Sequence, residues 1–273
     1  MQKPNQKQVV RLAAAGTYVV AVAVNALANI LPINGVTTAQ VSDAYPNLFT
    51  PVGLTFSIWG VIYLLLALHC LFQFGVLLRE KSEKHSELLF RVGIFFTVTN
   101  VANALWMLAW HYGALAVSVG LMLVLLVCLA VIELLLRRVV LAPAEAALLR
   151  LPFSIYFGWI TVATIANITV WLVSIGWGRF GFAESAWAVA ILVVGALIGG
   201  ITGIRCNDIA YVLVIIWAYA GILIRHVSQQ GYALQYPSVF YTALFCIAFL
   251  LMTLVYIRVK AVQAKQNAGP DHA

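Results

Sequence analysis

The chain has 273 residues, of which 63% are hydrophobic and only 9% are charged, and its net charge is +7. A soluble globular domain is about 45–50% apolar and about 25% charged, so this composition excludes an ordinary soluble enzyme. The hydrophobicity excludes a disordered chain, and four cysteines in this length exclude a disulfide scaffold. The apolar runs are long and continuous, which excludes the alternating strands of a transmembrane β-barrel. The sequence therefore predicts an all-α fold, a polytopic transmembrane helix bundle.

The gaps between charged residues predict about eight spans, each about 20 residues long. The first two are expected at 9–31 and 51–78. The uncharged run Val92–Ile132 is long enough for two spans, with a tight turn near His111–Gly113. The remaining four are expected within 151–178, 185–204, 209–224 and 226–257, the last beginning near Pro237. The seventh, 209–224, is short for a span unless its flanking charges reach toward the interface.

The distribution of basic residues predicts an orientation. If the N-terminus is cytoplasmic, fourteen of the sixteen Lys and Arg residues fall on cytoplasmic segments, and only Arg179 and Arg225 fall outside. This asymmetry favours an even number of spans with both termini in the cytoplasm. The basic excess then faces anionic lipid, so we expect the bilayer, and no nucleic acid, as a partner. We expect the membrane to be the plasma membrane of a bacterium.

Sequence patterns for catalysis and metal binding are missing. There is no Walker-type phosphate loop, no CxxC pair and no HExxH pattern. We therefore expect no metal site, no obligate cofactor and no enzyme activity of these kinds. His69 is expected to form a hydrogen bond with a neighbour inside its span, and Glu133 to pair with Arg137 one turn later.

Trp and Asn side chains gather on two predicted helices. Asn103, Trp106 and Trp110 are spaced i, i+3, i+7 and share one face. A second set of residues on the fifth predicted helix is spaced by four positions: Trp159, Ala163, Asn167 and Trp171. An Asn in hydrocarbon is costly unless it forms a hydrogen bond. Such a face either holds a ligand that has an apolar plane and polar groups, or joins neighbouring helices. The residues alone leave both interpretations open.

Three segments resemble, in order and spacing, the translocator protein or tryptophan-rich sensory protein family, TspO/MBR. They are Pro51-x7-Trp59-x3-Tyr63, Asn103-Ala104-Leu105-Trp106, and Trp159-x3-Ala163-Thr164-x2-Asn167-x3-Trp171 with Tyr156 upstream. The resemblance covers residues 9–176, or five helices. The chain departs from the family pattern in its three further spans and in the position of Pro152, one turn early. Leu172 also stands where an Arg usually follows the last Trp.

The resemblance implies a five-helix domain over 1–178, followed by three additional helices over 179–260 and a polar tail over 261–273. It implies a pocket for a hydrophobic planar ligand, either tetrapyrrole-like, as a porphyrin is, or sterol-like. The implied ligand-binding residues are Trp59, Tyr63, Asn103, Trp106, Tyr156, Trp159, Ala163, Asn167 and Trp171. The first loop, Pro32–Thr50, is expected to act as a lid.

The implied function is transport or sensing of this ligand. A secondary transporter or permease for another small solute is one alternative. A membrane enzyme that breaks down porphyrin in light is the other.

The sixth predicted span carries glycines spaced by four, at Gly195, Gly199 and Gly203. Small residues at this spacing let two helices approach closely in a membrane. We expect this face to pack against another helix of the same chain. A second protomer, which would make a homodimer, is the alternative.

Overall fold

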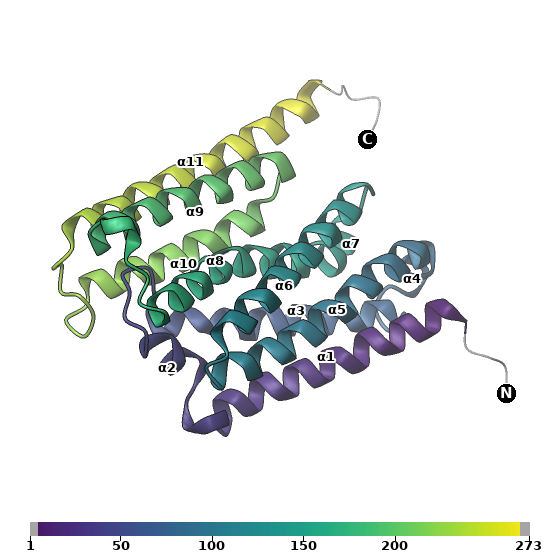
Figure 1. The fold of residues 1–273 in the computed structure, drawn as a ribbon. Coiled ribbons are helices and arrows are strands. Elements are labelled where there is room, and N and C mark those ends of the chain that lie inside the picture. Colours follow the sequence, from purple (N-terminus) through teal and green to yellow (C-terminus); the bar gives the residue numbers. More distant parts are fainter. Residues whose placement is uncertain (1–4, 268–273) are drawn as a thin grey trace. The chain divides into compact units, whose positions relative to one another are not determined.

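Eight helices in the described part of the chain, residues 5–267 of this computed structural model, are long and apolar enough to span a membrane (Figure 1). They are α1 (Gln6–Ile30), α3 (Ile58–Gln73) with the turn η2 (Gly53–Ser57) before it, α5 (Ser86–His111), α6 (Leu115–Arg137), α8 (Leu151–Ser174), α9 (Glu184–Cys206), α10 (Ile209–Val227) and α11 (Pro237–Asn267). The predicted all-α class and the eight spans are confirmed. The short seventh span is α10, which has 19 residues.

Short helices that the sequence analysis did not predict connect the spans. They are α2 (Thr38–Asp43), α4 (Arg79–Lys84) and α7 (Pro143–Leu149), together with the turns η1 (Ile33–Gly35) and η3 (Arg179–Gly181). At the other end of the chain, α11 continues through the first part of the expected polar tail as far as Asn267. Residues 268–273 of that tail lie outside the described residues.

Local signals explain where the spanning helices begin and end. The Asn5 side chain accepts a hydrogen bond from the Lys7 N–H at 3.4 Å and caps α1. Asp208 caps α10 in the same way, accepting from the Tyr211 N–H at 3.0 Å. Gly113 has a φ of +71° in the turn that separates α5 from α6. The predicted division of the long uncharged run at His111–Gly113 is therefore confirmed.

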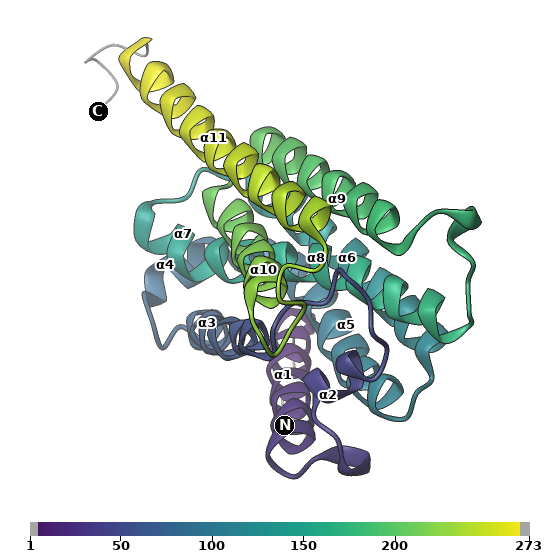
Figure 2. The same cartoon turned by 90° about the vertical axis from the view of Figure 1, so that its left-hand side faces the viewer.

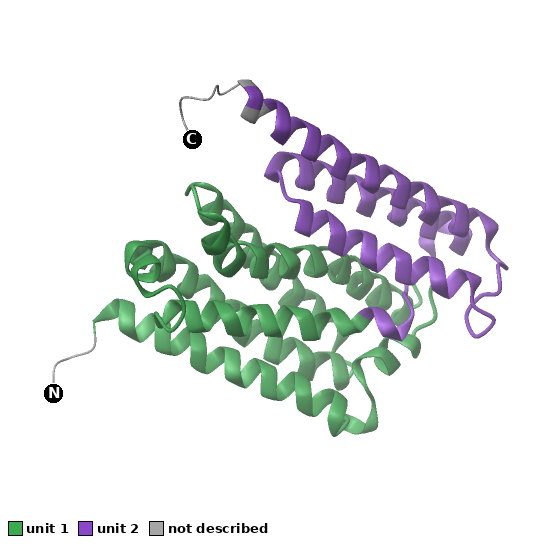
Figure 3. Cartoon of the chain, turned by 180° about the vertical axis from the view of Figure 1, so that it is seen from behind, with its two compact units in different colours: residues 1–47, 56–177 green, residues 48–55, 178–273 purple. Residues whose placement is uncertain are grey.

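The chain divides into two compact units (Figure 3). Unit 1 holds the chain up to Asn47 and Phe56–Trp177, and unit 2 holds Leu48–Thr55 and the chain from Gly178 onward. In unit 1 the spanning helices form a closed ring in the order α1, α5, α6, α8, α3, with each helix contacting the next and α3 contacting α1. The short helices pack against helices of this ring. Helix α2 contacts α5, α4 contacts α3 and α5, and α7 contacts α3 and α8.

Unit 2 is a bundle of α9, α10 and α11, in which each helix contacts the other two (Figure 2). Glycines of α9 lie at the contacts. A methyl group added at Gly199 would meet Ile215 of α10 at 2.7 Å, and one at Gly200 would meet Phe249 of α11 at 2.6 Å. An added methyl at Gly203 would collide with Val212. Gly195 is buried on the same helix. The glycine face therefore packs within the chain.

The segment Leu48–Thr55 is bound to α10 within unit 2. The Val52 N–H donates to the Gly221 carbonyl at 3.2 Å, and the Trp217 indole N–H donates to the Thr55 carbonyl at 3.0 Å. His226 Nε2 lies 3.0 Å from the Leu48 carbonyl, which can only accept, so Nε2 carries the proton. The first loop is thus divided, with its beginning in unit 1 and its end held by α10.

Candidate functional site

Five aromatic rings from three helices of unit 1 form one contiguous group, the aromatic cluster. Trp59 of α3 lies at its centre. Its ring centroid is 5.5 Å from that of Tyr63, 5.9 Å from Trp106, 5.8 Å from Tyr156 and 6.2 Å from Trp159. Each Trp in the cluster is at least nine-tenths buried. The structure therefore brings together residues that lie about a hundred positions apart in the sequence.

Helical spacing explains how the cluster forms. Trp59 and Tyr63 are four residues apart on α3, and Tyr156 and Trp159 are three apart on α8, so each pair shares a helix face. The α3 pair stacks nearly parallel, with an interplanar angle of 18°. Trp106 projects from α5. Edge-on and stacked contacts of this kind are the preferred geometries of aromatic pairs.

Asn103 of α5 is the polar centre beside these rings. Its Oδ1 accepts from Asn25 Nδ2 of α1 at 2.7 Å and from the Tyr63 hydroxyl at 3.2 Å. Asn25 Nδ2 donates in addition to the Ala21 carbonyl at 2.9 Å, which fixes the orientation of both amides. Sequence reasoning missed Asn25, although an Asn inside the uncharged first span was a usable signal.

The cluster holds buried hydrogen-bond donors that have no partner among the described residues. They are the indole N–H groups of Trp59, Trp106 and Trp159 and the Nδ2 of Asn103. Trp110 differs, because its indole N–H donates to a backbone carbonyl at 3.2 Å. An unpaired buried donor costs about 1–3 kcal/mol. This part of unit 1 can therefore supply hydrogen bonds to acceptor groups such as carbonyl or carboxylate oxygens.

The other residues predicted for the site lie farther along α8. Asn167 is buried and lies 3.1 Å from the Ser118 hydroxyl of α6. The Ser118 hydroxyl donates to Asn167 Oδ1 and also lies 2.8 Å from the Leu115 carbonyl. The contact joins α6 to α8, and Asn167 Nδ2 has no partner among the described residues. Ala163 is partly buried, and so is Trp171, which makes no ring contact with the aromatic cluster in the part of the chain that the structure describes.

His69 of α3 has a structural role. Its Nδ1 lies 3.0 Å from the Leu148 carbonyl and must donate to it. Its Nε2 is then the acceptor for Gln73 Nε2 at 2.8 Å. The ring also packs edge-on against Phe96 and Phe153. Both ring nitrogens are satisfied, so the predicted hydrogen bond to a neighbour is confirmed.

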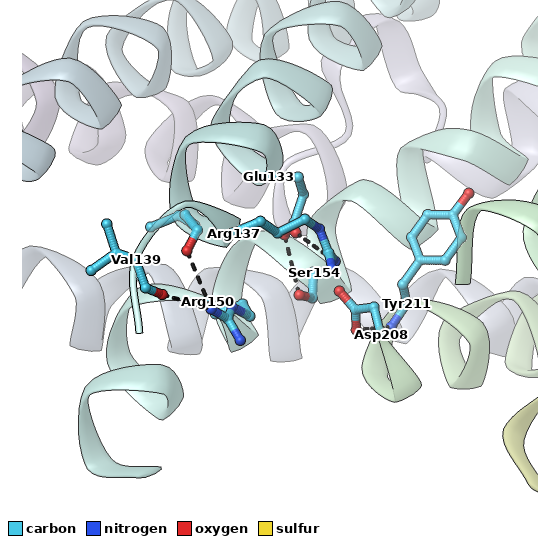
Figure 4. Close-up of polar contacts among 8 residues, drawn as sticks. Glu133, Arg137, Val139, Arg150, Ser154, Asp208 and Tyr211 are labelled. Carbon is cyan, nitrogen blue, oxygen red and sulfur yellow. Dashed lines mark hydrogen bonds and ion pairs between the residues drawn. The ribbon is translucent and has the colours of Figure 1, made fainter. Parts of the chain in front are cut away.

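A group of polar contacts lies at the C-terminal end of α6 (Figure 4). The predicted pair is confirmed, since Arg137 Nη2 lies 3.2 Å from Glu133 Oε2. The Ser154 hydroxyl of α8 donates to the other Glu133 oxygen at 3.1 Å. Arg150 donates to the carbonyls of Leu136 and Val139 at the end of α6, at 3.2 and 3.3 Å. These contacts fasten α6 to α8 and satisfy the carbonyl groups of a helix end.

Comparison with known proteins relates the chain to a protein family. No curated protein and no solved structure matches the chain. The model of the TSPO-like protein family matches residues 11–256. This range runs from the first spanning helix into the eighth, so it includes the three helices beyond the five that carry the motifs. Together with the eight apolar helices, the match identifies an integral membrane protein. The chain belongs to the TSPO-like protein family.

Proposed function

We propose that this protein binds a planar, largely apolar ligand with acceptor groups at its edge, at the aromatic cluster of unit 1, and acts in the transport or sensing of that ligand. A porphyrin that carries carboxylates has this chemistry. The observation that supports the proposal is the set of buried, unpaired donors on Trp59, Trp106, Trp159 and Asn103, next to stacked rings. Proteins seldom keep such groups without a partner, because the cost is not recovered elsewhere.

The two kinds of contact have different energetic roles. Ring contacts with a planar ligand are worth about 0.5–1.5 kcal/mol beyond the area they bury. A hydrogen bond to a charged acceptor is worth about 1.5–3 kcal/mol. The rings therefore favour any planar apolar molecule, whereas the donors select those with acceptor groups. Affinity for a carboxylated ligand should exceed affinity for an uncharged one of the same size.

Two porphyrins of similar size test this division. Protoporphyrin IX carries two carboxylates and octaethylporphyrin carries none. Binding to the purified protein is measured by quenching of Trp fluorescence. We expect protoporphyrin IX to bind at least tenfold more tightly, which corresponds to about 1.4 kcal/mol.

The variant Trp159→Phe keeps an aromatic ring and removes one donor. It should weaken protoporphyrin IX binding by at least about tenfold, which corresponds to a loss of about 1.5 kcal/mol, and leave octaethylporphyrin binding nearly unchanged. The control is Trp187→Phe on α9, which lies outside unit 1. Equal affinity for the two porphyrins, or equal effects of the two variants, would place the ligand elsewhere. Loss of porphyrin on illumination, with a new product, would instead support an enzyme.

A further inference from the structure

A second feature of unit 1 is a basic cavity of about 380 Å³ at one end of the helix ring. One side of the cavity is formed by the last turn of α4 and the first turns of α5. The other side is formed by the C-terminal end of α6. Its polar wall is made by Lys84, His85, Glu87, Arg91 and Arg138. Its apolar wall is made by Leu88, Leu135 and Val139. The cavity is separate from the aromatic cluster, and none of its residues belongs to the site described above.

The charges in the cavity wall do not balance. Its one carboxylate, Glu87, is already engaged by Lys7 at 3.3 Å and by Arg91 at 3.2 Å. Arg138 forms no salt bridge or side-chain hydrogen bond with any described residue, and Lys84 forms no salt bridge with one. Arg138 therefore faces the cavity with no carboxylate paired to it, and Lys84 faces it with only the electrostatic attraction of Glu145 and no salt bridge. An anion would be attracted to them, and the engaged Glu87 would oppose it little.

The neighbouring carboxylate does not supply the missing anion. Glu145 of α7 accepts from the Ala142 N–H at 2.9 Å, and its two oxygens lie 3.4 Å from His85 and 3.8 Å from Lys81. The Ala142 hydrogen bond, followed by the contact with His85, holds the pKa of Glu145 below its ordinary value. Glu145 thus remains charged and is engaged by these partners.

We propose that this cavity binds the phosphate of an anionic membrane lipid. Its position at the ends of spanning helices puts it where headgroups lie, and the apolar wall suits the glycerol and the first carbons of the acyl chains. Two exposed apolar side chains, Leu134 of α6 at 57% exposure and Val140 in the loop after α6 at 94%, provide a surface for the rest of the lipid. A free phosphate compound carries the same charge but has no apolar part to pack against the apolar wall.

Native mass spectrometry of the detergent-purified protein, titrated with dioleoyl phosphatidylglycerol or dioleoyl phosphatidylcholine, tests the proposal. We expect one copy of the anionic lipid to be retained in preference to the zwitterionic one. Each cation near an anionic lipid is worth about fivefold in affinity, so Lys84→Gln with Arg138→Gln should weaken retention roughly 25-fold. The matched control is Arg258→Gln with Lys260→Gln, which removes the same charge from α11.

The outcomes separate the possible sources of the anion. Both substituted pairs are surface changes and should leave the melting temperature of the lipid-free protein nearly unchanged. Retention of phosphatidylcholine equal to that of phosphatidylglycerol would overturn the proposal. So would a double variant within twofold of the control. Displacement of the lipid by inorganic phosphate or glycerol phosphate at equal concentration would assign the cavity to a soluble phosphate compound and overturn the lipid assignment.

Discussion

Replacing Asn103 with Leu removes an acceptor that other helices of unit 1 share. Leu has a similar volume, so lost hydrogen bonds, and not a new cavity, should dominate the effect. In soluble proteins each newly unpaired donor would cost about 1–3 kcal/mol. In a membrane the average per bond is about 0.6 kcal/mol, because the unfolded chain in lipid also finds partners. The bonds from Asn25 and Tyr63 therefore predict a loss of about 1 kcal/mol.

Unfolding of the purified protein by dodecyl sulfate in mixed micelles, followed by circular dichroism, measures this loss. The control is Asn29→Leu, since Asn29 is exposed on α1 and, among residues 5–267, bonds only to the carbonyl of Asn25 in its own helix, at 2.9 Å. Its effect should stay within about 0.5 kcal/mol. Adding Tyr63→Phe to Asn103→Leu should cost less than it does in the unmodified protein, since the shared bond is already gone. If Asn103→Leu destabilised no more than Asn29→Leu, the reasoning about a shared acceptor would be refuted.

Two further predictions concern unit 2 and the orientation of the chain. In the same titration, Gly203→Ala should lower the free energy of unfolding by about 1 kcal/mol. Overpacking against Val212 destabilises by about 1–3 kcal/mol, and the higher helix propensity of Ala offsets about 1 kcal/mol of this. Gly120→Ala on α6 meets open space and should be neutral or stabilising, and equal effects at the two glycines would contradict the close approach. A reporter fused to the C-terminus should read as cytoplasmic, given fourteen Lys and Arg residues against two, and an external signal would contradict this orientation.

The spans could be predicted because bilayer thickness dictates their length and charge interrupts them. The same rule placed the end of the seventh predicted span too early, at residue 224, because α10 continues through Arg225 and His226 to Val227. The helices α2, α4 and α7 could not be predicted this way, since they lie between the spans and are too short to show an apolar run. Pro143 opening α7 was a local signal for one of them.

The site was only partly predictable, for a different reason. Spacing could assign Trp59 and Tyr63 to one helix face. The residues that this face contacts, however, depend on which helices are neighbours in the fold. Asn25 meets Asn103 because α1 lies next to α5 in the ring. The bond between Leu48 and His226 joins residues 178 positions apart, and no local pattern encodes it. Long-range pairing of this kind follows from the packed fold.

Two kinds of buried polar group in unit 1 differ in whether their donors are paired. His69 and Trp110 have satisfied donors, and they behave as connections between elements. Three unpaired indole N–H groups instead lie on rings that touch one another, at Trp59, Trp106 and Trp159. In hydrocarbon no bulk water offsets their cost, so the ligand-free protein carries a local penalty that an acceptor-bearing ligand removes. Binding to the folded state at a hundred times Kd adds about 2.7 kcal/mol to stability. A structural cluster would gain nothing from such a ligand, so ligand-dependent stabilisation distinguishes a binding site from a packing contact.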